Sequence, residues 1–334
     1  MSVTTEAAAF VADFAFAPNP GRAARLDAAV RAGLADSLTA VFSALGLPPD
    51  ARQRRFLKRV EAGPVPPGVF AVYVELVLAV MRDEDDAARA LAHALFGVPT
   101  AAAGLSVVTL DDGGLGNGQA ERYRRLLAED IGAPIDALAA AALADACAKL
   151  DAALALLGAG APDVAAELRV LIRQIVLVRA SGAGEGTTFG GASSFALWGA
   201  LVLNAERLAD PLEAAVQLAH ETAHTLLFGL AQGGQLTDNA AEARYASPLR
   251  IDPRPMEGVA HAVFVTGRMI YTLDRLLAGG VLDIAAAARA REQLVRNEAA
   301  YAAGLATVMK HATLTPAGEA AFRAVRRHMD RRAR

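Results

Sequence analysis

The chain has a single cysteine, few aromatic residues and no excess of basic charge. Cys147 alone cannot form an internal disulfide, and its apolar surroundings fit a reducing, intracellular setting. A net charge of −3 gives no electrostatic basis for binding nucleic acid or an anionic membrane. We see no signal-peptide pattern and no charge-free apolar run long enough to span a bilayer. We therefore expect a cytoplasmic protein that binds neither nucleic acid nor membranes.

The scarcity of aromatic residues also bears on the fold. Aromatics make up 5% of the chain, whereas apolar residues, many of them alanine, make up 54%. Alanine has the highest helix propensity, while aromatic and β-branched residues favour strands. The composition therefore predicts a mainly α protein with a small β component, and 334 residues allow one large or two medium domains.

Hydrophobic periodicity places the expected elements. Helices are predicted over residues 22–45, 52–62, 69–81, 120–129, 134–157, 163–171, 211–229, 255–277, 284–305 and 316–332. Strands are predicted at 105–110, 175–180 and 194–204. We place a boundary after residue 171. Residues 1–171 form a helical N-terminal region, to which we assign peptide recognition as a hypothesis, and residues 172–334 form a zincin-like α+β catalytic region that binds metal.

One short motif carries a defined chemistry, the His-Glu-x-x-His pattern of residues 220–224. On a helix, His220 and His224 are separated by roughly 40° of rotation and about 6 Å of rise, so both imidazoles can converge on one metal ion. Glu221 lies about 100° further around the helix, beside the ion rather than on it. In a hydrolase, this is the place of the general base for metal-bound water.

A second predicted helix can complete the site. Glu257 and His261 are four residues apart and share a helix face, so either could supply a third ligand. Arg250 and Arg254 lie in the proline-rich segment just before this helix, and arginine holds carboxylates in a bidentate fork. We therefore expect an anion clamp there. Because two strands precede the motif helix, an edge strand could hold an extended peptide beside the metal.

These segments together resemble a known family. The sequence LAHETAH within residues 211–226, the stretch SPLRIDPRP at 247–255 and the following GVAHAVFV helix resemble the αKG-HExxH-type peptide β-hydroxylases. The resemblance implies an Fe(II) and 2-oxoglutarate enzyme that hydroxylates a side chain in a ribosomally made precursor peptide. It implies iron ligands at His220, His224 and His261. It further implies that Arg254, with Arg250 in reserve, holds the distal carboxylate of 2-oxoglutarate, and that Glu221 orients a ligand or bound water.

The competing hypothesis is a zinc metallopeptidase of gluzincin type. In that arrangement Glu257 is the third Zn(II) ligand, Glu221 is the general base, and the strand at 194–204 binds the substrate. A catalytically inactive helical scaffold that binds peptides is a third class. The sequence gives no prediction of the oligomeric state.

Overall fold

The structure is a computed structural model that describes residues 11–98, 104–181, 189–247, 252–332 and 334. It is mainly helical, with 67% helix and 8% strand in a small mixed sheet, as the composition predicts. Among the described residues, none of the helices is both long enough and apolar enough to cross a membrane.

Backbone contacts divide the chain into two compact units that interleave along the sequence. The first unit comprises Met1–Ala23, Ala148–Leu168 and Leu208–Arg334, and the second comprises Ala24–Cys147 and Arg169–Arg207. This division differs from the boundary expected after residue 171. The physical reason is strand pairing: residues 174–177 pair in parallel with residues 106–109, which ties the strands after residue 171 to the N-terminal helices.

The second unit is built on a small sheet. Its strands are β1 (Ser106–Thr109), β2 (Ile135–Ala137), β3 (Gln174–Ala180), β4 (Gly191–Ala192) and β5 (Ala200–Asn204), in the order β1-β3-β5-β4, with β2 paired to β3. β3 runs parallel to β1 and β5, and β2 and β4 are antiparallel to their partners. The central strands are almost wholly apolar and buried, which is typical of parallel strands covered on both faces.

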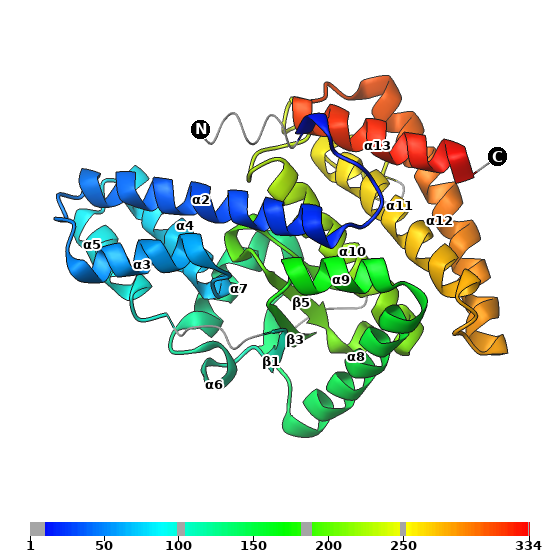
Figure 1. Cartoon of the computed structure of the whole chain (residues 1–334), viewed down its shortest axis with the longest axis horizontal. Coiled ribbons are helices and arrows are strands. Elements are labelled where there is room, and N and C mark those ends of the chain that lie inside the picture. Colours follow the sequence, from blue (N-terminus) through cyan, green and yellow to red (C-terminus); the bar gives the residue numbers. More distant parts are fainter. Residues whose placement is uncertain (1–10, 99–103, 182–188, 248–251, 333) are drawn as a thin grey trace. The chain divides into compact units, whose positions relative to one another are not determined.

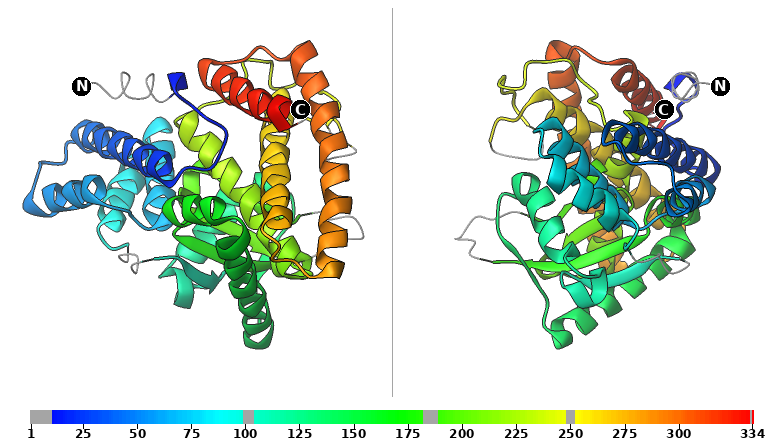
Figure 2. Two further views of the ribbon diagram at one scale, coloured as in Figure 1. Left: turned by 45° about the vertical axis from the view of Figure 1, so that its right-hand side comes forward. Right: turned by 90° about the vertical axis from the view of Figure 1, so that its left-hand side faces the viewer.

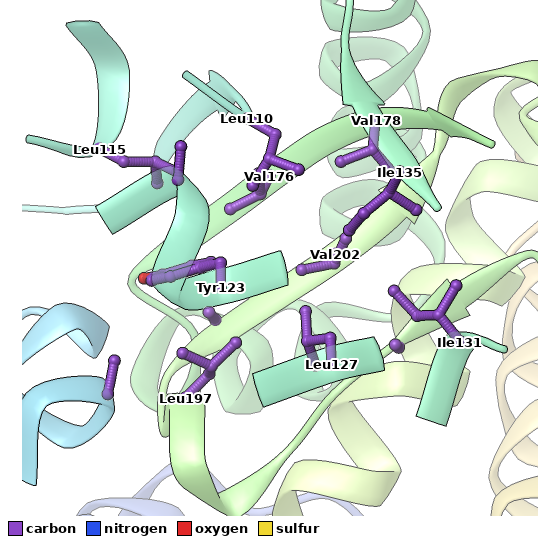
Figure 3. Close-up of a cluster of buried hydrophobic side chains, with 14 of the residues drawn as sticks. Leu110, Leu115, Tyr123, Leu127, Ile131, Ile135, Val176, Val178, Leu197 and Val202 are labelled. Atoms are coloured by element: carbon purple, nitrogen blue, oxygen red, sulfur yellow. The ribbon is translucent and has the colours of Figure 1, made fainter. Parts of the chain in front are cut away.

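The second unit also contains helices. They are α2 (Pro20–Ala44), α3 (Ala51–Ala62), α4 (Pro67–Met81), α5 (Asp85–Leu95), α6 (Asp112–Leu115) and α7 (Gln119–Ile131), with α2 beginning in the first unit. Of these, α6 contacts β1 and α7 contacts β4. Valines of β3 and β5 pack against Tyr123 and Leu127 of α7 (Figure 3). The Tyr123 hydroxyl donates to Gln174 Oε1 at 2.8 Å, so its buried polar end is satisfied. Truncation of Leu127 to alanine would cost about 2–5 kcal/mol of stability.

Two predicted elements differ from the observed ones. The helix expected over 134–157 begins only with α8 (Ala140–Gly160), because residues 135–137 pair with the end of β3 instead. The strand expected over 194–204 is shortened to β5. Ser194 caps a 3₁₀ turn at Phe195–Leu197, and Gly199, with φ of +87°, redirects the backbone before the strand begins. Trp198 is buried in this turn, and its indole N–H donates to Asp27 at 3.0 Å.

The first unit contains the predicted metal-binding helices. It includes α9 (Pro162–Leu171) up to residue 168, α10 (Pro211–Leu230), α11 (Met256–Ala278), α12 (Ile284–His311) and α13 (Pro316–Arg332). α11 and α12 lie side by side in Figures 1 and 2, and α10 packs on α11. α10 begins where Asp210 accepts hydrogen bonds from Leu212 and Glu213, followed by Pro211 in the first turn. The fold thus brings the His-Glu-x-x-His helix against the helix that carries Glu257 and His261.

Candidate metal centre

Beyond its first turn, helix α10 is buried except along one stripe. Between Ala214 and Leu230, all of which the structure describes, the partly exposed residues are Gln217, His220, His224 and Phe228. Their spacing of three or four residues puts them on one helix face. The chemistry-bearing face of the helix is therefore the face that solvent and small ligands can reach.

His220 and His224 meet on this face as the spacing predicts. Their Nε2 atoms are 3.2 Å apart, and the ring centroids are 4.9 Å apart. The other ring nitrogen of His220, Nδ1, lies 3.3 Å from the sulfur of Met269 on α11. Both imidazoles are thus held by specific contacts, with their Nε2 edges turned towards each other.

His261 is brought to the same cluster, on the opposite edge of His224. Its Nδ1 lies 2.9 Å from Nδ1 of His224, and the two rings are stacked with centroids 5.2 Å apart. The Nε2 atom of His261 lies 3.2 Å from Glu257 Oε1. The side chains therefore form a continuous chain of contacts from Met269 through His220, His224 and His261 to Glu257.

The Glu257 carboxylate has several donors besides His261. It accepts hydrogen bonds from the backbone N–H of Leu236, at 2.9 and 3.0 Å to its two oxygens, and from the N–H and hydroxyl of Thr237, each at 3.0 Å. Burial alone would raise the pKa of Glu257, but the contacts with His261, Leu236 and Thr237 together lower it below its usual value. Glu257 is therefore an ionised carboxylate whose oxygens are already engaged.

Burial keeps the motif histidines neutral. It lowers the pKa of His220 to about 4. It also lowers the pKa of His224 well below its usual value, and the neighbouring His220 and His261 add to the effect. Charging a group that has lost its water is unfavourable, so these imidazoles keep a lone pair at neutral pH. A neutral imidazole is the form that binds a metal.

The ring nitrogens of the three histidines contact different partners. Nε2 of His261 lies near the Glu257 carboxylate and Nδ1 of His220 lies near the Met269 sulfur, and both of these partners can only accept. His224 turns its Nδ1 edge to His261 and its Nε2 edge to His220. The Nε2 atoms of His220 and His224 therefore face each other, away from both Glu257 and Met269.

The pair of Nε2 atoms fits a metal ion. Nitrogens bound at about 2.1 Å to one ion, at angles of about 90–110°, lie about 3.0–3.4 Å apart, which includes the observed separation. The full set of three predicted ligands does not converge, because His261 contacts the Nδ1 edge of His224 and not the Nε2 edge. Accordingly, the described residues contain no group of three or more His, Cys, Asp or Glu side chains placed to hold an ion.

Glu221 lies beside the Nε2 pair. Its Oε1 atom is 3.9 Å from His220 Nε2 and accepts a hydrogen bond at 2.9 Å from the amide of Gln217, one turn earlier on α10. The residue is 2% exposed. A buried carboxylate at this place can accept a proton from, or orient, a small molecule bound at the pair, as the motif predicts.

The two predicted arginines have different outcomes. Arg250 lies outside the described residues. Arg254 is half-buried just before α11, where its backbone pairs with Tyr245 through hydrogen bonds of 2.8 and 2.9 Å. Its guanidinium has no hydrogen bond or ion pair with the described residues, which leaves it available to an anion. A Cβ added at Gly258 would lie 3.7 Å from the Cβ of Arg254. Arg254 therefore lies beside the first turn of α11.

Three residues of the cluster were not predicted from the sequence. Gln217 and Phe228 lie four residues before Glu221 and four after His224, so helical spacing could have identified both. The Phe228 ring packs on His224 and His261, with centroids 6.3 and 5.2 Å away. Met269 gives no sequence signal, because its contact with His220 depends on how α10 and α11 pack.

Comparison with known proteins does not place the chain in a family. A scan against protein-family models found no match, and a search of curated proteins found no relative.

Proposed function

We propose that this chain is a metal-dependent enzyme whose ion is bound by Nε2 of His220 and His224. The observation that supports this proposal is the pair of imidazoles, kept neutral by burial, whose Nε2 atoms face each other 3.2 Å apart on a partly exposed helix face while their Nδ1 atoms contact Met269 and His261. Metal-binding histidines usually donate their second N–H to an acceptor.

Within that class we propose an Fe(II) and 2-oxoglutarate-dependent hydroxylase acting on a ribosomally made precursor peptide. Bound Fe(II) and 2-oxoglutarate would supply the electrons that reduce and thereby activate dioxygen for hydroxylation of the substrate. Glu221, restrained by Gln217, would orient a small molecule at the ion, and Arg254 would hold the distal carboxylate of 2-oxoglutarate. The sequence resemblance gives His261 as a third ligand, whereas its contacts favour a different role that is developed below.

The zinc peptidase of gluzincin type remains the alternative, but one observation weighs against it. That arrangement needs a carboxylate of Glu257 on the metal, and here Leu236, Thr237 and His261 occupy both of its oxygens. Moving Glu257 to an ion would leave two buried backbone N–H groups without partners, at about 1–3 kcal/mol each.

Binding of 2-oxoglutarate to protein loaded anaerobically with Fe(II) tests the proposal. We expect saturable binding that requires the metal, and succinate formation once oxygen is admitted. In Arg254→Ala we expect a dissociation constant about 100-fold to 1,000-fold higher, because truncation of one partner of a desolvated ion pair costs roughly 3–5 kcal/mol. Arg244→Ala, an exposed arginine of the same segment, is the matched control.

Three results would count against parts of this proposal. Zinc retained through purification, together with peptide hydrolysis and no 2-oxoglutarate binding, would contradict the hydroxylase and favour the peptidase. Unchanged affinity in Arg254→Ala with a loss in Arg250→Ala would move the clamp to Arg250. Unchanged affinity in both variants would exclude either arginine as the clamp.

A further inference from the structure

We infer that Glu257 and His261 are positioning residues rather than metal ligands, and that they act as a relay that holds His224 in the tautomer whose Nε2 is free to bind the ion. This inference rests on the proposed function, because it assigns a role towards the same metal. It reduces the protein ligands of the ion from three side chains to two. It also gives Glu257 a role that neither the hydroxylase hypothesis nor the peptidase hypothesis contains.

The first step is the rigidity of Glu257. Its carboxylate is held by the N–H groups of Leu236 and Thr237, and these two residues are themselves fixed on their other side. The carbonyl of Leu236 accepts the N–H of Thr315 at 3.0 Å, and Thr237 forms a backbone bridge with Leu314. Glu257 therefore starts the relay from a fixed place and with a fixed charge.

The second step is the transfer of this constraint through His261. The residue is 8% exposed, so its ring has little room to rotate, and it lies against Phe228. In the inferred arrangement, His261 directs its proton from Nε2 to the Glu257 carboxylate, which can only accept, and so presents Nδ1 as an acceptor. Nδ1 of His224 lies 2.9 Å away, at hydrogen-bond distance, so the proton between the two rings then belongs to His224.

The third step is the consequence for the metal. A His224 proton on Nδ1 leaves Nε2 bare on the side of His220. The opposite tautomer would put a proton where the ion must bind. Groups that orient a metal-binding histidine in this way typically contribute about 10–100-fold in metal affinity.

The imidazole protons can be observed directly in metal-free protein. Two-bond ¹H–¹⁵N correlation spectra distinguish Nδ1–H from Nε2–H tautomers, and single His→Gln variants assign the signals. We expect His224 as the Nδ1–H form and His261 as the Nε2–H form. The Nε2–H form of His224 in the wild-type protein would overturn the relay, whatever metal the protein binds.

Substitution of His261 separates a relay from a ligand. In His261→Gln, the amide oxygen can accept the His224 proton and the amide N–H can donate to Glu257, whereas alanine can do neither. Co(II) binding, measured by competition with a chelator, should weaken by about 10–100-fold in His261→Ala and by less than about tenfold in His261→Gln. Equal and larger losses in both variants would instead make His261 a ligand. His93→Gln, at an exposed position, is the control for the substitution itself.

Substitution of Glu257 by glutamine gives a second test of the relay. Its amide can satisfy either the backbone donors or His261 but not both, so we expect Co(II) affinity to fall by about 10–100-fold with the fold retained by circular dichroism. The same change should move the His261 proton away from Nε2 in the spectra. The exposed Glu292→Gln should change neither quantity. Unaltered His261 tautomer and Co(II) affinity in Glu257→Gln would contradict the proposed role of Glu257.

The outcomes also separate this inference from the proposed function. Wild-type protein that binds no Co(II) and no Fe(II) would contradict the metal site. The tautomers are measured without metal, so they would still decide whether the relay exists.

Discussion

Helix α11 contributes to two buried polar clusters, and the two differ in how they avoid an unpaired buried charge. Around Arg268, seven residues beyond His261, charge is paired: Nη1 of Arg268 lies 2.7 Å from Glu167 Oε1, and both residues are less than 5% exposed. Around His261, burial instead keeps the neighbouring imidazoles of α10 neutral. The comparison teaches that a paired charge contributes to the cohesion of the unit, whereas a neutral imidazole is the form that can bind a metal ion.

The surroundings of each cluster support this contrast. The guanidinium of Arg268 lies over the rings of Phe16 and Phe264, 5.2 and 5.7 Å from their centroids, and Glu167 also accepts the N–H of Asn19 at 2.9 Å. The Arg268 cluster therefore joins α9 and α11 to the segment before α2. The His224 cluster instead borders the partly exposed stripe of α10. Of these two clusters, the His224 cluster is therefore the one that a small ligand can approach from solvent.

The largest expected effect on stability comes from breaking the charged cluster. Glu167→Ala leaves Arg268 as an unpaired buried cation, so we expect the free energy of unfolding to fall by about 3–5 kcal/mol in urea titrations. Co(II) affinity of the protein that remains folded should not change. A loss of stability below about 1 kcal/mol would show that the pair is not what holds these segments together.

A smaller loss is expected from crowding the segment that holds Glu257. A Cβ added at Gly318 would lie 2.1 Å from the carbonyl oxygen of Leu236, which cannot move without disturbing the hydrogen bond to Glu257. Gly318→Ala should destabilise the protein by about 1–3 kcal/mol and also weaken Co(II) binding. Gly33→Ala, where nothing lies within 4 Å, should stabilise the protein by about 0.5–1 kcal/mol. Full Co(II) affinity in Gly318→Ala would separate this segment from the site.

Acidification should lower the free energy of unfolding by a smaller amount, through the histidines of the His224 cluster. Because the folded state lowers the pKa of His220 to about 4 and that of His224 below its usual value, the unfolded chain binds protons below about pH 6.5 that the folded chain does not. The free energy of unfolding of metal-free protein should therefore fall from about pH 6.5 towards pH 4, by at most about 1.4 kcal/mol per pH unit for each imidazole. Above pH 6.5 these groups should have no effect.

The control for the pH dependence is the double variant His220→Gln, His224→Gln. Urea titrations at several pH values should give a shallower loss of stability on acidification in the variant than in the wild-type protein. Parallel curves would show that the two imidazoles do not titrate with depressed pKa values.

Local patterns were sufficient for much of the fold and for half of the site. The periodicity that ends near Gly229 predicted α10, and the spacing of His220 and His224 predicted their convergence, because both depend only on helix geometry. The proximity of His261 to His224 also follows from the sequence, although its contact through Nδ1 does not. Ring orientation depends on partners, and the partner that orients His261 is Glu257.

The remaining features depend on contacts between distant segments. The role of Glu257 is set by the amides of Leu236 and Thr237, some 20 residues away, which no periodicity reveals. Strand β2 is three residues long, and it pairs with residues 178–180 of β3, which extend beyond the pairing of β3 with β1. The same pairing across the sequence explains why the compact units do not follow the boundary expected after residue 171.

The most direct test is equilibrium binding of Fe(II) under anaerobic conditions to the wild-type protein and to His220→Ala and His224→Ala. We predict one ion per chain in the wild type and, in either variant, a loss of affinity greater than the 10–100-fold that is typical of residues around a metal site, with circular dichroism unchanged. Full occupancy of Fe(II) in either folded variant would contradict the assignment of this histidine pair as the metal site.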